Sequence, residues 1–332
     1  MTVRAISTRL TLLFSLISLL IATTSFIACS SDDGMDDDYE AELKDFVYHP
    51  NNRRLSEATE LKVLAIGNSF THDATAYINE LADSMGLDKK RFCIYVMNAA
   101  GASLSYWNKI YRSHKVDSAY RMAGQIYMPV IKAPMADIIA QNWDVVVLQQ
   151  YSGDADKYYT FNPSLSTLTK TIRRHCTNSN VMVAWNLTHS YGPARSGSAE
   201  NSQSQWERIV KAAKMVMKRD SLDFVIPSGT ALQNARHTVL NNKSLLTLDD
   251  IHIGFGTARY VTACTWVETL LSPMFATSVT GRTGNHIVTD SETNGRKHNS
   301  EDWKADVTEA NRELCQQCAL QACRSPFEVT MP

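Results

Sequence analysis

Short apolar runs alternate with amphipathic segments along most of this chain. In the first run, residues 61–66, only Lys62 is polar, which is typical of a strand buried on both faces. Further strands are predicted at 91–98, 143–149, 181–185 and 224–226, and helical spacing of apolar residues occurs at 165–175, 203–217, 229–236 and 257–271. This alternation predicts a parallel sheet that is covered by helices on both faces. Right-handed crossovers then bring the carboxyl ends of all the strands to one edge of the sheet.

The first predicted strand leads directly into a turn. Gly67 and Asn68 interrupt the apolar run, and both residue types tolerate a tight turn. A helix is predicted to follow, with Asp73 as its N-cap and Gly86 as its stop. Ser69 therefore lies in a strand-to-helix turn, where open α/β sheets keep their active sites and where helix N–H groups can stabilise an oxyanion. In the alternative interpretation, Ser69 only caps the turn.

The first residues have the pattern of an export signal rather than of a folded domain. Arg4 and Arg9 precede an apolar run at 10–22, and small residues follow it, so 1–28 is predicted to be a secretory signal. The apolar run is too short for a membrane span. The sequence Phe-Ile-Ala-Cys that ends at Cys29 resembles a bacterial lipobox, in which Cys29 is lipidated. Ordinary signal cleavage with an incidental cysteine remains the alternative.

Residues 29–60 are predicted to be an acidic tether, because 30–42 contains too few core-forming residues to fold. Serine and acidic residues directly after the cysteine resemble the surface-export signal of Bacteroidetes lipoproteins. We therefore expect an outer membrane lipoprotein that faces the periplasm or the cell surface. The catalytic domain is predicted at 61–272. Residues 273–332 are expected to form a surface excursion and a final helix, from about Trp303, packed on the same domain.

The length and charge of the chain limit the classes of protein to which it can belong. Its 332 residues suit one large domain. A formal net charge of −1 and the lack of a basic tract argue against a nucleic-acid partner. The stretch 102–142 is rich in aromatic residues, which either line a binding cleft or pack against the core.

Seven cysteines are present, and export permits disulfides among the six besides Cys29. Those six are Cys93, Cys176, Cys264, Cys315, Cys318 and Cys323. The last three include a single C-x-x-C pair without nearby histidines, which is weak support for zinc. They are better interpreted as structural or disulfide cysteines.

A nucleophilic serine needs a base and a group that orients the base. Asp249 and His252 are three residues apart, just ahead of a predicted helix, on a loop that we expect at the same sheet edge as Ser69. This spacing lets the carboxylate hold one imidazole nitrogen while the other faces a hydroxyl. His72 is the alternative base. His189 and His237 have no carboxylate at a comparable spacing.

These blocks together resemble a known superfamily. Gly-Asn-Ser-Phe-Thr at 67–71, a glycine after the second strand and Asp-x-x-His before the last core helix are similar to the SGNH (GDSL-like) hydrolases. The resemblance covers about residues 60–272. Within the superfamily, the chain resembles more specifically the DUF4886 branch found in Bacteroidetes, and residues 225–236 are also similar to that branch. It implies an α/β fold, namely a three-layer α/β/α sandwich with a flavodoxin-like, five-stranded parallel sheet. It also implies that Ser69 is the nucleophile, His252 the base and Asp249 its orienting group.

The resemblance further implies oxyanion donors from the backbone N–H groups of Ser69 and Gly101 and from one side-chain amide. The third block departs from the family pattern. This chain has Leu-Gln-Gln-Tyr-Ser at 148–152 where the family often has Gly-x-Asn-Asp. Related carbohydrate acetylesterases are similar in having glutamine at that strand end. Strand alternation favours Gln149 over Gln150 as the donor. Asn68, in place of the frequent aspartate, is a second departure.

The sequence therefore predicts an exported serine esterase that removes O-acetyl or other small acyl groups from carbohydrate through an acyl-enzyme. No metal or cofactor is expected, because the motifs of P-loops, dinucleotide sites and zinc proteases are absent. The expected partners are an acylated carbohydrate or another small ester, and a membrane through Cys29. One alternative is a glycan-binding surface lipoprotein that retains the fold with weak or no catalysis. Another is a lipase or thioesterase.

Overall fold

The computed structural model describes residues 39–113, 118–122, 131–294 and 304–331. The predicted signal, Cys29 and the most acidic part of the predicted tether lie outside these residues. The chain divides into two compact units, Met1–Lys44 and Asp45–Pro332. The described part of the first unit contains a short helix at residues 39–43. The second unit holds the sheet and every predicted catalytic residue.

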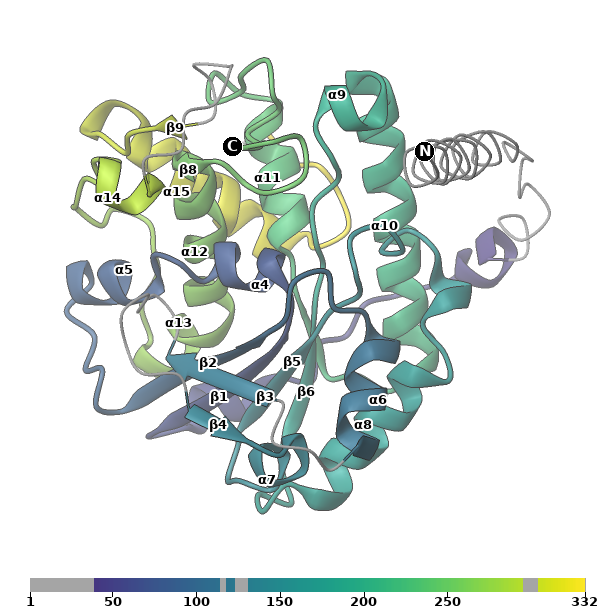
Figure 1. Cartoon of the computed structure of the whole chain (residues 1–332). Coiled ribbons are helices and arrows are strands. Elements are labelled where there is room, and N and C mark those ends of the chain that lie inside the picture. Colours follow the sequence, from purple (N-terminus) through teal and green to yellow (C-terminus); the bar gives the residue numbers. More distant parts are fainter. Residues whose placement is uncertain (1–38, 114–117, 123–130, 295–303, 332) are drawn as a thin grey trace, which may run out of the picture. The chain divides into compact units, whose positions relative to one another are not determined.

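A seven-stranded sheet forms the centre of the second unit, in the order β4-β3-β2-β1-β5-β6-β7 (Figure 1). Five of the strands are parallel: β1 (Leu61–Gly67), β2 (Phe92–Asn98), β5 (Val145–Leu148), β6 (Met182–Asn186) and β7 (Phe224–Ile226). Taken in chain order these five have the spatial order 2-1-3-4-5, which is the flavodoxin-like order. The predicted five-stranded parallel sheet is confirmed.

Two strands that the sequence analysis did not predict extend this sheet. β3 (Ser118–Met122) and β4 (Ile131–Ala133) pair antiparallel beside β2. They belong to the aromatic stretch 102–142, together with α6 (Leu104–Ser113) and α7 (Met135–Ile139). Trp107 in α6 is buried, and its indole N–H donates to the carbonyl of Gly67 over 3.2 Å. For this residue the packing interpretation is correct.

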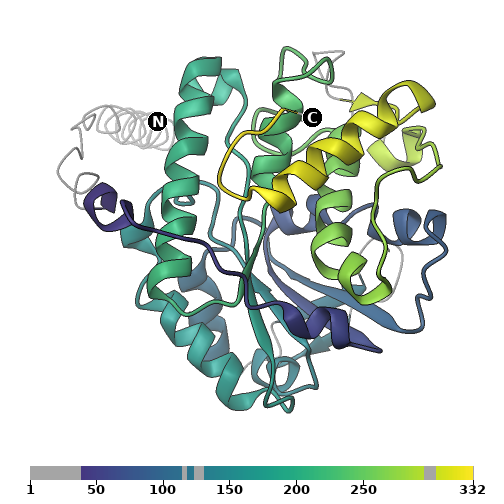
Figure 2. The ribbon, with the colours of Figure 1, turned by 180° about the vertical axis from the view of Figure 1, so that it is seen from behind.

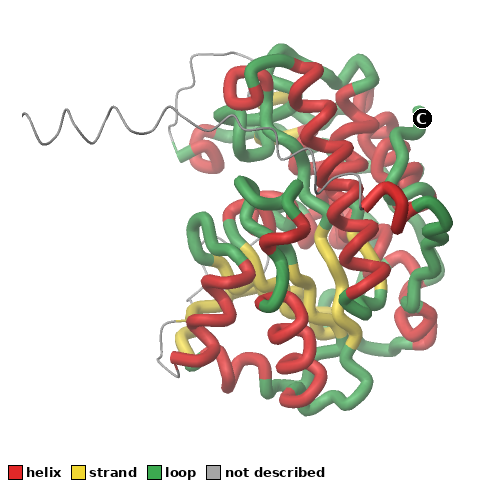
Figure 3. The backbone as a smooth tube through the Cα atoms, turned by 90° about the vertical axis from the view of Figure 1, so that its right-hand side faces the viewer, coloured by secondary structure: helices red, strands yellow, loops and turns green. Residues whose placement is uncertain are grey.

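Helices cover both faces of the sheet (Figures 2 and 3). On one face, α5 (Ile78–Ser84), α11 (Ser228–Arg236) and α12 (Thr257–Leu270) share one apolar cluster with alternate residues of the strands, such as Val63 and Val147. The other face is covered by α6, α8 (Ser164–His175) and α10 (Ala199–Arg219). The predicted three-layer sandwich is therefore confirmed.

The remaining elements are short, apart from the last helix. They are α3 (Arg53–Glu57), α4 (Ser69–Ala74), η1 (Tyr158–Thr160), α9 (Pro193–Ser196), β8 (Phe255–Gly256), α13 (Ser272–Phe275), α14 (Asp290–Thr293), β9 (Lys304–Ala305) and α15 (Glu309–Arg324). The last helix, α15, packs against α11 and α12. Among the described residues, no helix is both long and apolar enough to span a membrane.

The compact unit begins earlier than the sequence analysis predicts. The backbone N–H of Asn51 donates to the carbonyl of Asp223 over 2.7 Å, and the Tyr48 hydroxyl accepts from the N–H of Val225 over 2.9 Å. The side chain of Leu55 is fully buried. The prediction of a tether is therefore wrong for residues 45–60, because Tyr48, Asn51 and Leu55 of this stretch bond to or pack into the domain.

The six described cysteines are all free. Cys264, Cys315 and Cys318 are fully buried. They lie in the two packed helices α12 and α15, and burial is the first cause of the raised pKa of each thiol. In the described structure they fill space in the core as small apolar residues do.

Candidate active site

The turn after β1 starts a helix five residues earlier than the sequence predicts, with its cap at Asn68 instead of Asp73. Asn68 is the N-cap of α4, and its side-chain oxygen accepts from the backbone N–H of Phe70 over 3.0 Å. The prediction that Asp73 caps this helix is wrong, because Asn68 already supplies the acceptor. Asp73 is instead buried and forms an ion pair of 2.7 Å with Arg259.

The residue before this cap has to be glycine. A Cβ at Gly67 would collide with the hydroxyl of Thr71 and would press on the side chain of Gln149. The absence of a side chain therefore lets β1, α4 and the end of β5 meet closely beneath Ser69. Ser69 is the first residue of α4, and its backbone N–H has no acceptor within the helix.

The three residues predicted to form a triad lie together. Ser69 Oγ is 2.9 Å from His252 Nε2, although 183 positions separate them in the sequence. His252 Nδ1 is 2.9 Å from Asp249 Oδ2. Asp249 Oδ1 also accepts from the backbone N–H groups of Ile251 and His252 over 3.1 and 2.8 Å. The carboxylate is thus fixed by its own loop, and it directs the second imidazole nitrogen at the serine.

Asp249 and His252 each shift the pKa of the other in the direction that favours its charged form. Partial burial raises the pKa of Asp249, but hydrogen bonds from the ring and backbone of His252 outweigh it, so the pKa lies well below its usual range. The hydrogen bond that His252 donates to Asp249 raises the pKa of His252 above its ordinary value, against the effect of burial. Asp249 therefore remains ionised, and it stabilises the imidazolium that forms when His252 takes a proton.

A buried group of neutral side chains lies beneath the turn; we call it the amide network. Gln149 donates from Nε2 to Asn68 Oδ1 over 2.8 Å, and its Oε1 accepts from Thr71 Oγ1 over 2.5 Å and from Asn186 Nδ2 over 2.8 Å. All four side chains are at most 2% exposed. The network consists of Asn68, Thr71, Gln149 and Asn186, and it joins the ends of β1, β5 and β6.

The predicted oxyanion donors lie near this network. Gly101 has a positive φ of 62°, and its N–H has no acceptor among the described residues. Asn68 also holds the turn that contains Gly101, because its Nδ2 donates to the carbonyl of Ala102 over 3.1 Å. The Gln149 amide is engaged in the amide network, and its oxyanion role stays a prediction. The Gln150 side chain oxygen accepts from the backbone N–H groups of Leu104 and Tyr151.

A cleft of about 470 Å³ opens beside the serine and the histidine. Its lining comes from α4, the loop before α12, α12 itself and α14, and comprises Ser69, His72, Asp73, Leu248, Asp249, His252, Phe255, Arg259, Glu292, Thr293 and Asn294. The Arg259 guanidinium lies 4.0 Å from the centroid of the Phe255 ring. His72, the alternative base, lies in this wall with Nδ1 3.6 Å from Asp73, whereas His252 faces Ser69.

Several lining residues were not predicted from the sequence, and three of them, Glu292, Thr293 and Asn294, come from a distant part of the chain. They belong to the surface excursion, which has little periodicity and no motif. They reach the cleft only because the excursion folds back over the edge of the sheet that carries Ser69 and His252. Within the described residues, no group of three or more histidine, cysteine, aspartate or glutamate side chains is arranged to hold a metal ion.

His189 supports the site from the end of β6. Its Nε2 lies 2.8 Å from the carbonyl oxygen of Ile251, which can only accept, so this nitrogen donates. Its ring stacks on Phe70 with centroids 4.1 Å apart. Burial, with a smaller contribution from Arg236, lowers the pKa of His189 to about 3, so the ring is neutral. His189 thus connects the residue after Ser69 with the residue before His252.

Comparison with known proteins agrees with the motifs. The model of the family described as "Domain of unknown function (DUF4886)" matches residues 62–283, so the chain belongs to this family. A crystal structure of a DUF4886 family protein from Bacteroides uniformis is 25% identical, with a TM-score of 0.66 over 82% of this chain and 97% of that chain. The predicted membership of the DUF4886 branch is confirmed.

Two further solved structures are similar over a smaller part of the chain. One, from Slackia heliotrinireducens, is described as a candidate SGNH hydrolase (16% identity, TM-score 0.43, 63% of this chain and 98% of that chain). The other is an acetyl xylan esterase (15% identity, TM-score 0.42, 62% and 98%). Both TM-scores are below 0.5, so neither match decides the fold or the activity of this chain. Among curated proteins, none matches the chain significantly.

Proposed function

We propose that this protein is a serine hydrolase of the SGNH type that cleaves carboxylic esters. The observation that carries the proposal is the continuous hydrogen-bonded series from Ser69 through His252 to Asp249, with 2.9 Å at both joining contacts. A serine hydroxyl is a weak nucleophile by itself, and an oriented imidazole activates it. The open cleft beside Ser69 gives an ester access to this hydroxyl.

In the proposed reaction, Ser69 Oγ attacks the carbonyl carbon of the ester while its proton moves to His252 Nε2. The oxyanion accepts hydrogen bonds from the backbone N–H groups of Ser69 and Gly101. When the intermediate collapses, the ester C–O bond breaks and the alcohol leaves with the proton from His252. Water then attacks the acyl-enzyme by the same route, with His252 as the base, and releases the acid and free Ser69. Asp249 stays ionised throughout.

We infer that the substrate is a carbohydrate that carries O-acetyl or another small acyl group. Only two of the eleven residues that line the cleft, Leu248 and Phe255, are apolar. A lipase or thioesterase would need a longer apolar channel for its acyl chain. Polar side chains such as His72 and Asn294 offer donors and acceptors that suit sugar hydroxyls.

We also propose that the protein is anchored by a lipid at Cys29 on an outer membrane, facing the periplasm or the cell surface. The lipobox-like sequence and the acidic residues after it support this location. Cys29→Ala should move the protein from the membrane fraction to the soluble fraction and abolish labelling by a fatty acid. Unchanged retention, with no lipid on the parent protein, would contradict the anchor.

The central test of the activity is Ser69→Ala. The parent protein should react with a fluorophosphonate probe and release acetate from at least one member of a panel of acetylated polysaccharides. Ser69→Ala should do neither, and Ser105→Ala, which changes an exposed serine of α6, should behave as the parent does. Hydrolysis by Ser69→Ala at the parental rate would refute the proposal. Polysaccharide binding without labelling or turnover by the parent would favour the glycan-binding alternative.

A further inference from the structure

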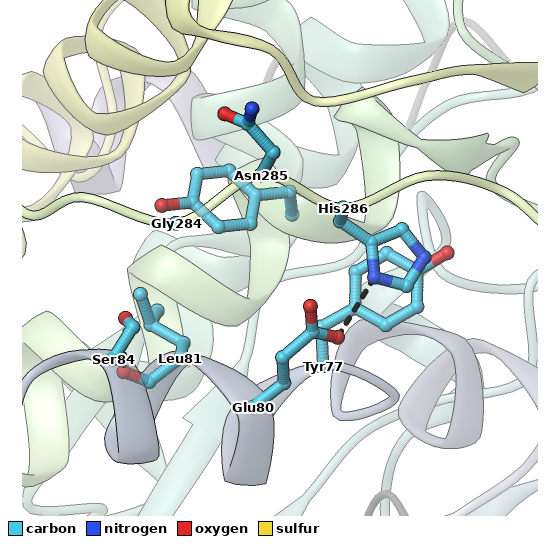
Figure 4. Close-up of a pocket in the computed structure, with 8 residues that line it drawn as sticks. Tyr77, Glu80, Leu81, Ser84, Gly284, Asn285 and His286 are labelled. Atoms are coloured by element: carbon cyan, nitrogen blue, oxygen red, sulfur yellow. Dashed lines mark hydrogen bonds and ion pairs between the residues drawn. The ribbon is translucent and has the colours of Figure 1, made fainter.

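One wall of the cleft is bonded to the rest of the domain through a group of titratable side chains. We call residues 284–294 the wall segment; it includes α14 and ends with the three lining residues 292–294. His286 in this segment contacts two carboxylates: Nδ1 is 2.7 Å from Glu80 Oε2, and Nε2 is 3.0 Å from Glu292 Oε2. Figure 4 shows His286 directed at Glu80, with the Tyr77 ring beside it.

Tyr77 completes this group, which we call the clamp: Tyr77, Glu80, His286 and Glu292. The Tyr77 hydroxyl donates to Glu292 Oε1 and accepts from the backbone N–H of Gly256 over 3.0 Å. Its ring lies 4.0 Å from the His286 ring, centroid to centroid. Both oxygens of Glu292 therefore have partners, and the clamp joins α5, α14 and the start of α12.

The clamp is charged and closely packed. Burial alone would lower the pKa of His286, but the hydrogen bonds and charges of Glu292 and Glu80 raise it to about 9, so the ring is a cation at neutral pH. Arg259 from α12 contributes a second positive charge near Glu292. The cavity beside Tyr77, Glu80 and His286 is only about 20 Å³, about one water molecule. These ion pairs join the wall segment to α5 through His286.

The chemistry of ester cleavage decides which part of the substrate meets this wall. The leaving alcohol takes its proton from His252 Nε2, so it has to lie on the His252 side of Ser69. His252 and residues 292–294 line the same cleft. Asn294, which is exposed and has a φ of 53°, presents its amide where a hydroxyl-rich alcohol would lie.

We propose that the wall segment forms the binding subsite for the alcohol part of the ester, a polyhydroxylated sugar, and that the clamp positions this subsite. His286 and Glu80 are thus positioning residues that act through residues 292–294. This inference rests on the proposed function and deepens it. It assigns the selection of the alcohol to the surface excursion, and the bond-breaking step to the triad.

The test compares two acetyl esters that differ only in the alcohol: phenyl acetate and an acetylated xylo-oligosaccharide. Glu80→Gln removes one charge of the clamp, and Asp83→Asn is the control, since it breaks an exposed ion pair of the same helix with Lys89. Glu80→Gln should raise KM for the oligosaccharide about 5- to 10-fold with kcat nearly unchanged, because uniform binding is lost. Phenyl acetate should be cleaved as by the parent, and Asp83→Asn should change neither reaction.

Equal losses on both esters would overturn the inference, because they indicate general damage, and so would no change on either ester. His286→Gln provides a second variant with the same expected KM effect if Glu80→Gln folds poorly. If the parent protein cleaves no ester, the proposed function fails separately. The subsite is then tested by competition: the xylo-oligosaccharide should slow labelling of Ser69 by a fluorophosphonate, at about 5- to 10-fold higher concentration for Glu80→Gln than for the parent.

Discussion

The two sides of Ser69 are built from different chemical groups. Beneath the nucleophile, the amide network uses neutral side chains that are at most 2% exposed and that bond to one another. Across the cleft, the clamp uses two carboxylates around one imidazolium, with the side chain of Glu80 53% exposed. The first arrangement holds the turn that carries Ser69, and the second holds one wall of the cleft.

The difference follows from the cost of burying polar groups. Neutral amides can be buried fully when each donor and acceptor is satisfied. A charge buried to the same extent needs a partner and still loses its hydration, so charged groups remain near the surface, where water reaches them. The geometry under Ser69 should therefore be independent of pH, whereas the geometry of the wall should change when His286 titrates.

The largest effect is expected at the triad itself. Asp249→Asn should lower kcat about 10³-fold or more, because the imidazole loses the group that orients it and stabilises its charge. The acid limb of the profile of kcat/KM against pH should move to lower pH, since Asp249 raises the pKa of His252. Steady-state kinetics between pH 5 and 9 measure both quantities. Asp250→Asn is the control; a similar loss there would contradict the assignment of Asp249.

A substitution in the amide network should mainly lower the stability of the folded domain. Gln149→Leu removes one hydrogen-bond partner each from the buried side chains of Asn68, Thr71 and Asn186, and we expect the free energy of unfolding to fall by about 3 kcal/mol. The value of kcat per folded molecule should fall by less than about 10-fold if the network only supports the turn. Denaturant unfolding and kinetics on one preparation separate the two effects. A fall in kcat of about 100-fold would instead support the oxyanion role predicted from the sequence.

A smaller effect is expected at His189, between the two halves of the triad. His189→Phe keeps a ring against Phe70 but removes the donor to the Ile251 carbonyl, so kcat should fall about 10-fold with KM unchanged. His189→Gln, which keeps a donor, should recover most of that loss. If the two variants have the same kcat, the hydrogen bond to Ile251 does not position the loop.

The smallest effect is expected from pH acting on the clamp. The pKa of His286 is raised from 6.5 to about 9, so its stabilising contribution is complete below about pH 6.5 and is lost as pH rises through about 9. KM of the parent for the acetylated oligosaccharide should therefore rise about two- to five-fold between pH 8 and 10. KM for phenyl acetate should stay constant. His286→Gln should remove this rise, and an unchanged rise in that variant would place its origin outside the clamp.

The sequence by itself determined the five parallel strands and their order along the chain, and it predicted the three residues that lie together as a triad. Buried parallel strands are continuous apolar runs, so β1, β2, β5, β6 and β7 are visible without any contact between them. Ser69 lies in one short local pattern, Gly-Asn-Ser after a strand, and Asp249 and His252 lie in another, Asp-x-x-His before a helix. The separation of 183 residues did not hide the pair, because both loops end at the same edge of a parallel sheet.

Only the tertiary structure decided which polar side chains bond to one another and which of them line the cleft. Whether Gln149 meets Asn68 or an oxyanion depends on the close approach of three strand ends, which no local pattern records. The contribution of Glu292 and Asn294 to the cleft depends on the path of an excursion without periodicity. Its position is determined by contacts such as that between His286 and Glu80, 206 residues apart, whose energy appears only after the rest of the domain has folded.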